Sequence, residues 1–125
     1  MPALPEIASK AWEERKGPVI FTTVDENGTP NSIYATCVSK FDEETIVIAD
    51  NYFDKTQQNI FAGSKGSVLY ITDDDKAFQL KGTIDYHKDG GIFDDMKQWN
   101  PEKLPGHAAA ALKIEEVYSG SEKLA

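Results

Sequence analysis

The sequence predicts a mainly β protein, a small antiparallel barrel with peripheral helices, formed as one domain over residues 1–125. Segments rich in β-branched and aromatic residues alternate with turn residues along most of the chain. Hairpin turns join most of these segments, and the regular strand-helix alternation that builds a parallel sheet is absent. With 125 residues, 40% of them hydrophobic, the chain is long enough for one core and short for two.

An amphipathic helix is expected first. Apolar residues recur at helical spacing, and charged residues occupy the other faces until Gly17 and Pro18 end the pattern. The apolar positions are Leu4, Ile7, Ala8, Ala11 and Trp12.

Three antiparallel strands are expected next. Residues 19–41 are rich in β-branched and aromatic side chains, and Asn27-Gly28 interrupts them with the dipeptide typical of a two-residue hairpin turn. This pattern predicts two strands. A polar turn over residues 42–44 then leads to a third strand over residues 45–49.

A second helix, over "DKTQQNI", should end near Gly63, because glycine is common after the last turn of a helix. "GSVLYITD" and "AFQLKGTIDYH" predict the fourth and fifth strands, with an acidic turn between them. Apolar residues in the fifth strand alternate with polar ones, so one of its faces should point to the core. The expected core positions are Phe78, Leu80, Gly82, Ile84 and Tyr86.

The C-terminal part of the chain predicts a third helix and a sixth strand. Residues 92–99 have apolar positions at helical spacing between Gly90-Gly91 and Pro101. The segment "AALKIEEVYS" is the sixth strand, with a bulge expected where Glu115 and Glu116 interrupt the alternation.

Composition argues against several classes of protein. Thirteen basic and twenty-one acidic residues give a net charge of -8, which opposes nucleic-acid binding. The apolar runs are far shorter than the roughly 20 residues that span a bilayer. The N-terminal residues lack the pattern of a secretory signal, so a cytoplasmic location is expected.

Metal and nucleophilic sites have little support in the sequence. His87 and His107 are separated by a predicted helix, and neither has a ligating partner at helical spacing. Cys37 is the only cysteine, which excludes an internal disulfide, and its place in a strand favours a buried, inert thiol. No metal ligand or catalytic residue is therefore assigned.

The start of the second helix raises a question of anion binding. Lys55 and Thr56 would add a charge and a hydroxyl to the free N–H groups at a helix start, a combination that suits a phosphate. Asp54 and Gln57 also have the spacing of a capping box, and a capping carboxylate would compete for the same N–H groups. Local features alone favour the capped helix and leave both readings open.

The whole chain resembles the pyridoxamine 5'-phosphate oxidase-related FMN-binding proteins, in particular their small single-domain members. The resemblance rests on "GTPNSIYATCVSKFDEETIVIADNYFDKTQQNI", on "AFQLKGTIDY" and on "HAAAALKIEEVYS". The Lys-Thr pair followed by Asn59-Ile60 is its most specific part. The fold that the resemblance implies is a small antiparallel split β-barrel of Greek-key type.

The resemblance also implies an FMN site. Lys55 and Thr56 match the residues that hold the FMN phosphate, and Asp54 is expected to face outward. A second group matches the segments that border the flavin ring and the ribityl chain, with Gln79 as a further polar contact. These positions are Tyr34, Ala35, Thr36, Cys37, Ile48, Ala49, Asp50 and Asn51.

Members of this family are usually homodimers with FMN at the subunit interface, so a homodimer is implied, with Trp99 a candidate contact from the partner. Two departures from the family pattern matter. Arg15 is the only arginine, which argues against pyridoxamine phosphate oxidation, and the acidic tracts argue against the polyanionic deazaflavin F420.

The resemblance implies a redox role, as an electron-transfer protein or as an oxidoreductase that reduces a small substrate, with a redox partner protein or small molecule still to be identified. The alternatives are a pyridoxamine 5'-phosphate oxidase-like enzyme and a non-catalytic binding or sensing module on the same barrel.

Overall fold

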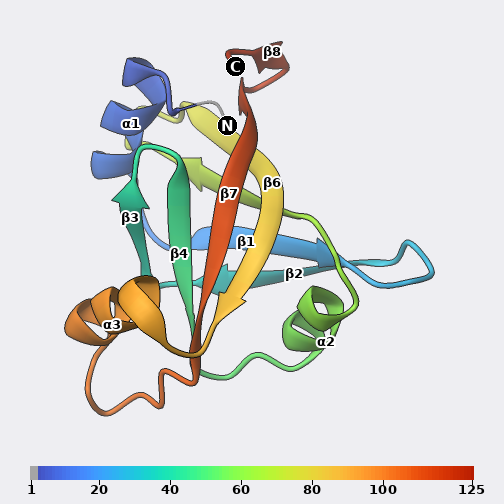
Figure 1. Cartoon of the computed structure of the whole chain (residues 1–125). Coiled ribbons are helices and arrows are strands. Elements are labelled where there is room, and N and C mark those ends of the chain that lie inside the picture. Colours follow the sequence, from blue (N-terminus) through green and yellow to red (C-terminus); the bar gives the residue numbers. More distant parts are fainter. Residues whose placement is uncertain (1–2) are drawn as a thin grey trace.

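The computed structural model describes residues 3–125 as a curled antiparallel sheet of eight strands with three helices around it (Figure 1). The strand order is β2-β1-β5-β6-β7-β4-β3, and β8 pairs with β7. The mainly β prediction is confirmed. The elements are α1 (Glu6–Glu13), β1 (Val19–Val24), β2 (Pro30–Ala35), β3 (Val38–Asp42), β4 (Thr45–Asp50), α2 (Lys55–Phe61), β5 (Gly66–Ile71), β6 (Ala77–His87), α3 (Gly90–Trp99), β7 (Ala108–Ser119) and β8 (Glu122–Lys123).

The second strand predicted within residues 19–41 is two strands in the structure, so its prediction as one element is wrong. The structure divides it at Thr36 and Cys37 into β2, which pairs with β1, and β3, which pairs with β4. No glycine or proline marks this break, so the sequence pattern does not reveal it. Because β2 and β3 lie at opposite ends of the strand order, residues 36–37 connect the two edges of the curled sheet. We call the line between these edges the seam.

The alanines of β7 are explained by burial on both faces. Ala110 and Leu112 belong to the core inside the curled sheet, whereas Ala109 and Ala111 pack beneath α3 with Met96. Neighbouring β4 is buried along its whole length for the same reason. Small side chains on the outer face let α3 approach the sheet closely.

The predicted bulge in the last strand is confirmed. Lys81 pairs with Glu116 and Gly82 pairs with Ile114, so Glu115 is the extra residue in β7. A Cβ atom on Gly82 would lie 1.8 Å from the carbonyl oxygen of Lys113. The sheet can therefore make this close approach only with glycine at position 82.

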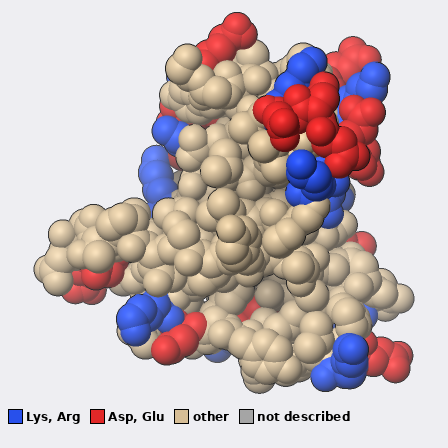
Figure 2. All heavy atoms as spheres, turned by 180° about the vertical axis from the view of Figure 1, so that it is seen from behind, with Lys and Arg blue, Asp and Glu red and all other residues tan. Residues whose placement is uncertain are grey.

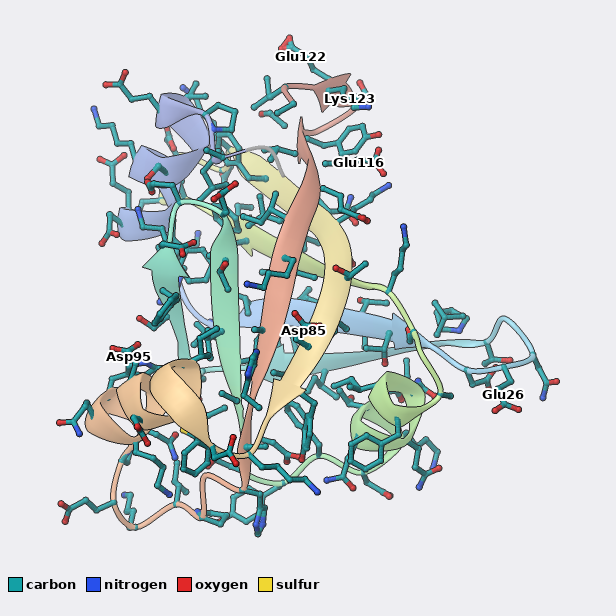
Figure 3. The ribbon with its side chains drawn as sticks, viewed as in Figure 1. Glu26, Asp85, Asp95, Glu116, Glu122 and Lys123 are labelled. Carbon is teal, nitrogen blue, oxygen red and sulfur yellow. The ribbon has the colours of Figure 1, made fainter. Side chains whose placement is uncertain are left out.

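Charged side chains lie mainly at the periphery, as Glu26 at the tip of the β1–β2 hairpin and Glu122 near the C-terminus illustrate (Figure 3). None of the helices described within residues 3–125 is long and apolar enough to cross a membrane.

Candidate functional site

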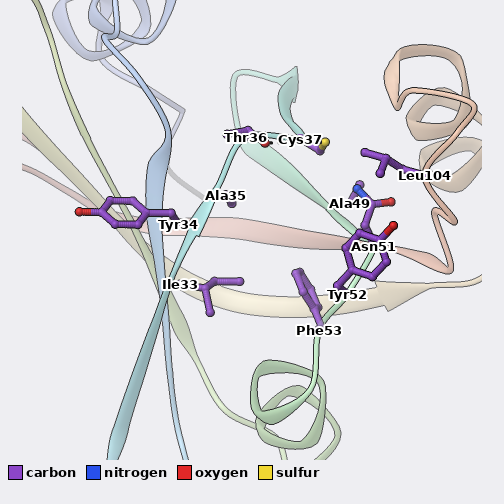
Figure 4. A pocket seen from close by; sticks show the side chains of 10 residues that line it. All are labelled: Ile33, Tyr34, Ala35, Thr36, Cys37, Ala49, Asn51, Tyr52, Phe53 and Leu104. Carbon is purple, nitrogen blue, oxygen red and sulfur yellow. Dashed lines mark hydrogen bonds between the residues drawn. The ribbon is translucent and has the colours of Figure 1, made fainter.

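A cavity of about 450 Å³ lies at the seam, where β2 leads into β3 and β4 leads into α2 (Figure 4). We call it the first cavity. Most of its lining side chains are apolar or aromatic, and the few polar groups come from turns. This composition is typical of a site for a small organic ligand. The lining residues are Ile33, Tyr34, Ala35, Thr36, Cys37, Ala49, Asn51, Tyr52, Phe53 and Leu104.

Many of the sequence-predicted cofactor residues meet in this cavity. The six that line it are Tyr34, Ala35, Thr36, Cys37, Ala49 and Asn51. Sequence reasoning missed four others. Tyr52 and Phe53 follow the predicted strand end directly, so their position and aromatic character were an available signal. Ile33 and Leu104 carried no such signal. The missed residues are Ile33, Tyr52, Phe53 and Leu104.

Lys55 and Thr56 follow the cavity wall but do not line the cavity itself. Lys55, two residues after Phe53, is exposed at the first position of α2. Thr56 is only 1% exposed, and its Oγ1 accepts a hydrogen bond from Asn31 Nδ2 at 3.2 Å. The structure thus adds Asn31, a β2 residue, to the neighbourhood of the Lys-Thr pair.

The capping box, one of the two readings of the Asp54–Gln57 spacing, does not form. Asp54 occupies the N-cap position but makes no side-chain capping bond, and its Oδ1 instead accepts a hydrogen bond from Gln58 Nε2 at 3.1 Å. Asp54 is exposed. Gln57 turns inward rather than back toward Asp54, because β4 and β6 offer it two partners there.

Those partners belong to a buried network centred on Asp50, which is 1% exposed. Asp50 Oδ1 accepts a hydrogen bond from the Phe53 backbone N–H at 3.0 Å. Its Oδ2 accepts from Gln57 Nε2 at 3.1 Å and from the Tyr86 hydroxyl. Gln57 Nε2 also donates to the Tyr86 oxygen at 3.0 Å. The network joins β4, α2 and β6 at one point.

The pKa of the Tyr86 hydroxyl should reflect its hydrogen bond to the Asp50 carboxylate. Burial, followed by the hydrogen bond to the Asp50 carboxylate, raises the pKa of Tyr86 from 10.0 to about 12. Because folding raises this pKa, the associated stability is complete below about pH 10 and is lost as the pH rises toward about 12. Tyr86→Phe should lower the free energy of unfolding at pH 7 by about 1.5 kcal/mol, measured by urea denaturation. The variant should also show a smaller loss of stability above pH 10.

Tyr118→Phe is the matched control for Tyr86→Phe. The Tyr118 hydroxyl also donates to a carboxylate, that of Glu116, at 2.6 Å, but at the protein surface. Solvent can replace that bond, so a much smaller loss is expected. Equal losses in the two variants would contradict the buried network as the cause.

Asn51 is held by a second buried network. Its side chain exchanges hydrogen bonds with that of Asn100, at 2.9 and 3.1 Å, and its Oδ1 also accepts from the Gly106 backbone N–H at 2.9 Å. Asn51 and Asn100 are both buried. The pair fixes the end of β4 to the segment between α3 and β7, and so holds one wall of the first cavity.

Removing either member of this pair should destabilise the protein. Asn51→Ala or Asn100→Ala leaves buried polar groups without partners and should cost about 2 kcal/mol in urea unfolding. The double variant should lose clearly less free energy of unfolding than the two single variants lose together, because the second substitution removes a group that the first left unpaired. Additive losses would show that the two amides act independently.

The remaining predicted residues lie outside the first cavity. Ile48 is buried in the core inside the sheet. Gln79 lines a separate shallow surface beside Lys81 and Glu116. Trp99 packs against the outer face of the sheet, and its buried Nε1 has no hydrogen-bond partner within residues 3–125.

A second cavity, of about 680 Å³, lies beside the first and shares the wall formed by residues 51–53. Its other lining residues are Asp50, Gln57, Tyr86, Lys88 and His107. In the described part of the chain, no group of three or more His, Cys, Asp or Glu side chains is arranged to hold a metal ion.

Comparisons with known proteins agree with this fold. The family model for pyridoxamine 5'-phosphate oxidase matches residues 6–120. The chain is 29% identical over 106 residues to the uncharacterised protein MJ0282 of Methanocaldococcus jannaschii, covering 81% of this chain and 71% of that protein.

Solved structures share the architecture at low sequence identity. A variant of HupZ from Group A Streptococcus matches with a TM-score of 0.80 and 17% identity, over 93% of this chain and 98% of that one. An FMN-binding protein from Syntrophomonas wolfei matches with a TM-score of 0.76 and 22% identity, over 90% and 83%. An F420 reductase and the heme storage protein HutZ from Vibrio cholerae have the same fold, with TM-scores of 0.69 and 0.68, each at 17% identity. The match with the reductase covers 92% of this chain and 98% of the reductase. The match with HutZ covers 95% of each chain.

Proposed function

Because the chain belongs to the pyridoxamine 5'-phosphate oxidase family, we propose that it is an FMN-binding flavoprotein with a redox role. The observation that carries the proposal is the first cavity, which has aromatic and apolar walls and whose lining residue Phe53 lies two positions before Lys55. In this arrangement the cavity receives the flavin ring, and the Lys55 ammonium binds the phosphate.

The residues present fit this cofactor. A cavity of about 450 Å³ has the size of a small-ligand site, and the rings of Tyr52 and Phe53 offer flat apolar surfaces. Lys55 makes no ion pair within residues 3–125, so its charge is available to a phosphate. Since Thr56 is buried, Lys55 and the Asn31 amide are better placed than the Thr56 hydroxyl to contact an anion.

When bound, FMN supplies hydride and one-electron chemistry. The chain contributes position and access. The Asn51–Asn100 pair ties the cavity wall to the segment that follows α3, and the Asp50 network ties the first turn of α2, which carries Lys55, to β4 and β6. No side chain of the first cavity is assigned as an acid or base.

Oxidation of pyridoxamine phosphate is disfavoured by the position of the single arginine. Arg15 lies over the Trp12 ring, 4.1 Å from its centroid, and donates a hydrogen bond to the Trp12 carbonyl. It is absent from the linings of both cavities. A substrate phosphate would have no arginine to bind it.

A homodimer forms part of the proposal. The outward side chains of β1, β2 and β5 are uncharged, and we call the surface that they form the neutral face. Charged residues of the neighbouring segments, such as Lys65 and Lys81, border it beside Ser67. Seen from behind, the middle of the molecule is largely free of charged side chains (Figure 2). A net charge of -8 makes such a face unusual and favours contact with a second copy. The neutral face consists of Ile20, Thr22, Val24, Pro30, Ser32, Tyr34, Ser67, Leu69 and Ile71.

Tyr34 connects the neutral face to the cavity. Its side chain is 76% exposed, although it lines the first cavity. Association through the neutral face would cover Tyr34 and enclose a bound flavin. Leu69→Lys, on this face but outside the first cavity, should yield a monomer by light scattering and weaken FMN binding. A monomeric wild type that binds FMN tightly would refute the interface site.

The direct test of the proposal is cofactor binding by the purified protein. Yellow protein that releases FMN on denaturation, or colourless protein that takes up one FMN per chain, would support it. Parallel titrations with F420 and hemin distinguish the ligands named for proteins of the same fold. Failure to bind FMN would overturn the proposal and favour a binding or sensing module without flavin.

A further inference from the structure

Asp50 is the one charged residue among the buried side chains of residues 3–125. Its three hydrogen-bond donors are all uncharged: the Phe53 backbone N–H, the Gln57 amide and the Tyr86 hydroxyl. No ion pair engages it within the described residues. A buried carboxylate without a cationic partner is costly for a fold, so a role beyond stability is expected for it.

The surroundings of Asp50 leave its negative charge without a neutralising cation. Each of the three neighbours donates, so both oxygens act as acceptors, as the carboxylate form requires. Burial, and then the hydrogen bond to Asp50 and its charge, raise the pKa of Tyr86 to about 12. Lys88 and His107 share the second cavity with Asp50, but both are exposed to solvent, which screens their charge.

This charge lies directly behind the wall of the first cavity. Ala49 and Asn51, the residues on either side of Asp50, both line that cavity (Figure 4). Phe53, a third lining residue, donates its backbone N–H to Asp50 Oδ1 at 3.0 Å. Asp50 itself belongs to the lining of the second cavity. One layer of backbone therefore separates the carboxylate from an occupant of the first cavity.

A fixed negative charge at this place opposes the reduction of a flavin. Uptake of two electrons from an external donor and of one proton from solvent leaves the flavin ring with one more negative charge than in its oxidised form. In the interior of a protein, two negative charges repel each other much more strongly than in water. The Asp50 carboxylate would therefore disfavour the reduced form relative to the oxidised form.

We infer that the Asp50 carboxylate lowers the reduction potential of FMN in the first cavity, so that the reduced protein is an electron donor. This inference rests on the proposed function, because it concerns the flavin of that same site. Asp50 acts on the cofactor through its charge and without touching it. A flavin with a lowered potential gives its electrons to an acceptor more readily, so the proposed redox role becomes the reduction of an external acceptor.

The test compares bound FMN in the wild type and in Asp50→Asn during stepwise reduction with dithionite, beside a reference dye of known potential. At the potential where half of the wild-type flavin is reduced, the ratio of reduced to oxidised flavin should be at least about tenfold higher in Asp50→Asn, which corresponds to about 30 mV for a two-electron couple. Asp54→Asn is the matched control. It removes the same charge from an exposed position and should change the ratio by less than about twofold.

A second set of variants keeps the Asp50 side chain in place. Gln57→Lys puts an ammonium where Gln57 Nε2 lies 3.1 Å from Asp50 Oδ2, and this cation should raise the ratio as Asp50→Asn does. Gln58→Lys adds the same charge at the next, exposed position of α2 and should have a much smaller effect. Tyr86→Phe disturbs the network but keeps the charge, so it should leave the ratio unchanged or lower it.

The outcomes separate this inference from the proposed function. Failure of the wild type to bind FMN overturns both, and it is seen before any potential is measured. In a protein that binds FMN, an unchanged or lower ratio in Asp50→Asn overturns the inference and leaves the proposed function in place. A rise in Tyr86→Phe as large as that in Asp50→Asn would also overturn it, because the cause would then be the network and not the charge. If Asp50→Asn does not fold, equal ratios in Gln57→Lys and Gln58→Lys would overturn the inference.

Discussion

Lys55→Ala should weaken FMN binding by about 1.5–3 kcal/mol and leave riboflavin binding little changed. The difference arises because riboflavin lacks the phosphate that the Lys55 ammonium is proposed to bind. Titration followed by quenching of flavin fluorescence measures both affinities. The predicted loss corresponds to roughly a 10- to 150-fold rise in Kd for FMN alone.

Lys10→Ala is the control, because it removes the same charge from α1, which is distant from α2 in sequence. If Lys10→Ala also weakens FMN binding, the effect reflects the overall charge of the protein. Equal losses for FMN and riboflavin in Lys55→Ala would place Lys55 against the ring or the ribityl chain. Asn31→Ala extends the test, and a loss specific to FMN would add Asn31 to the phosphate site.

Gly82→Ala should produce the largest change in stability, a loss of at least about 3 kcal/mol in the free energy of unfolding. The new Cβ would lie 1.8 Å from the Lys113 carbonyl oxygen and 2.8 Å from its carbon, both backbone atoms that cannot move aside independently. The pairing of β6 with β7 would have to open at the bulge. Urea unfolding followed by circular dichroism measures the loss.

Gly91→Ala provides the contrast. A Cβ at this position in α3 meets no atom within 4 Å, and its backbone does not have a positive φ. Since alanine favours helix more than glycine, this variant should be neutral or more stable by up to about 1 kcal/mol. A small effect for Gly82→Ala would mean that β7 shifts its register without cost, contrary to the bulge described above.

The order of elements was largely predictable, because alternation and turn residues report directly on strands and hairpins. The divided strand was not, since Thr36 and Cys37 have side chains typical of a strand and the break is set by pairing with two different neighbours. Local spacing also failed at Asp54 and Gln57. There the tertiary partners Asp50 and Tyr86 outweighed a capping interaction.

The residues of the candidate site were also predictable only where they lie close to one another in sequence. Residues consecutive with the strand end, such as Ala49 and Asn51, could be assigned from the resemblance and do line the first cavity. Leu104 could not, because it reaches the cavity from a segment more than fifty residues away in sequence. Asn100 and Gly106 were hidden for the same reason, as their contacts with Asn51 exist only in the folded chain.

The seam also has a mechanical consequence. In the described chain no ladder of hydrogen bonds joins β2 to β3, and only residues 36–37 connect them covalently. No backbone hydrogen bond holds Thr36 in the described chain, so small rotations there can let the two edges move apart or together, whereas Cys37 is held to β4 because its carbonyl accepts a hydrogen bond from the Ala49 N–H at 3.0 Å. Deformation elsewhere in the sheet would break paired backbone groups. The first cavity thus lies along a line that no ladder of inter-strand hydrogen bonds crosses, where its width can adjust to the thickness of a planar guest.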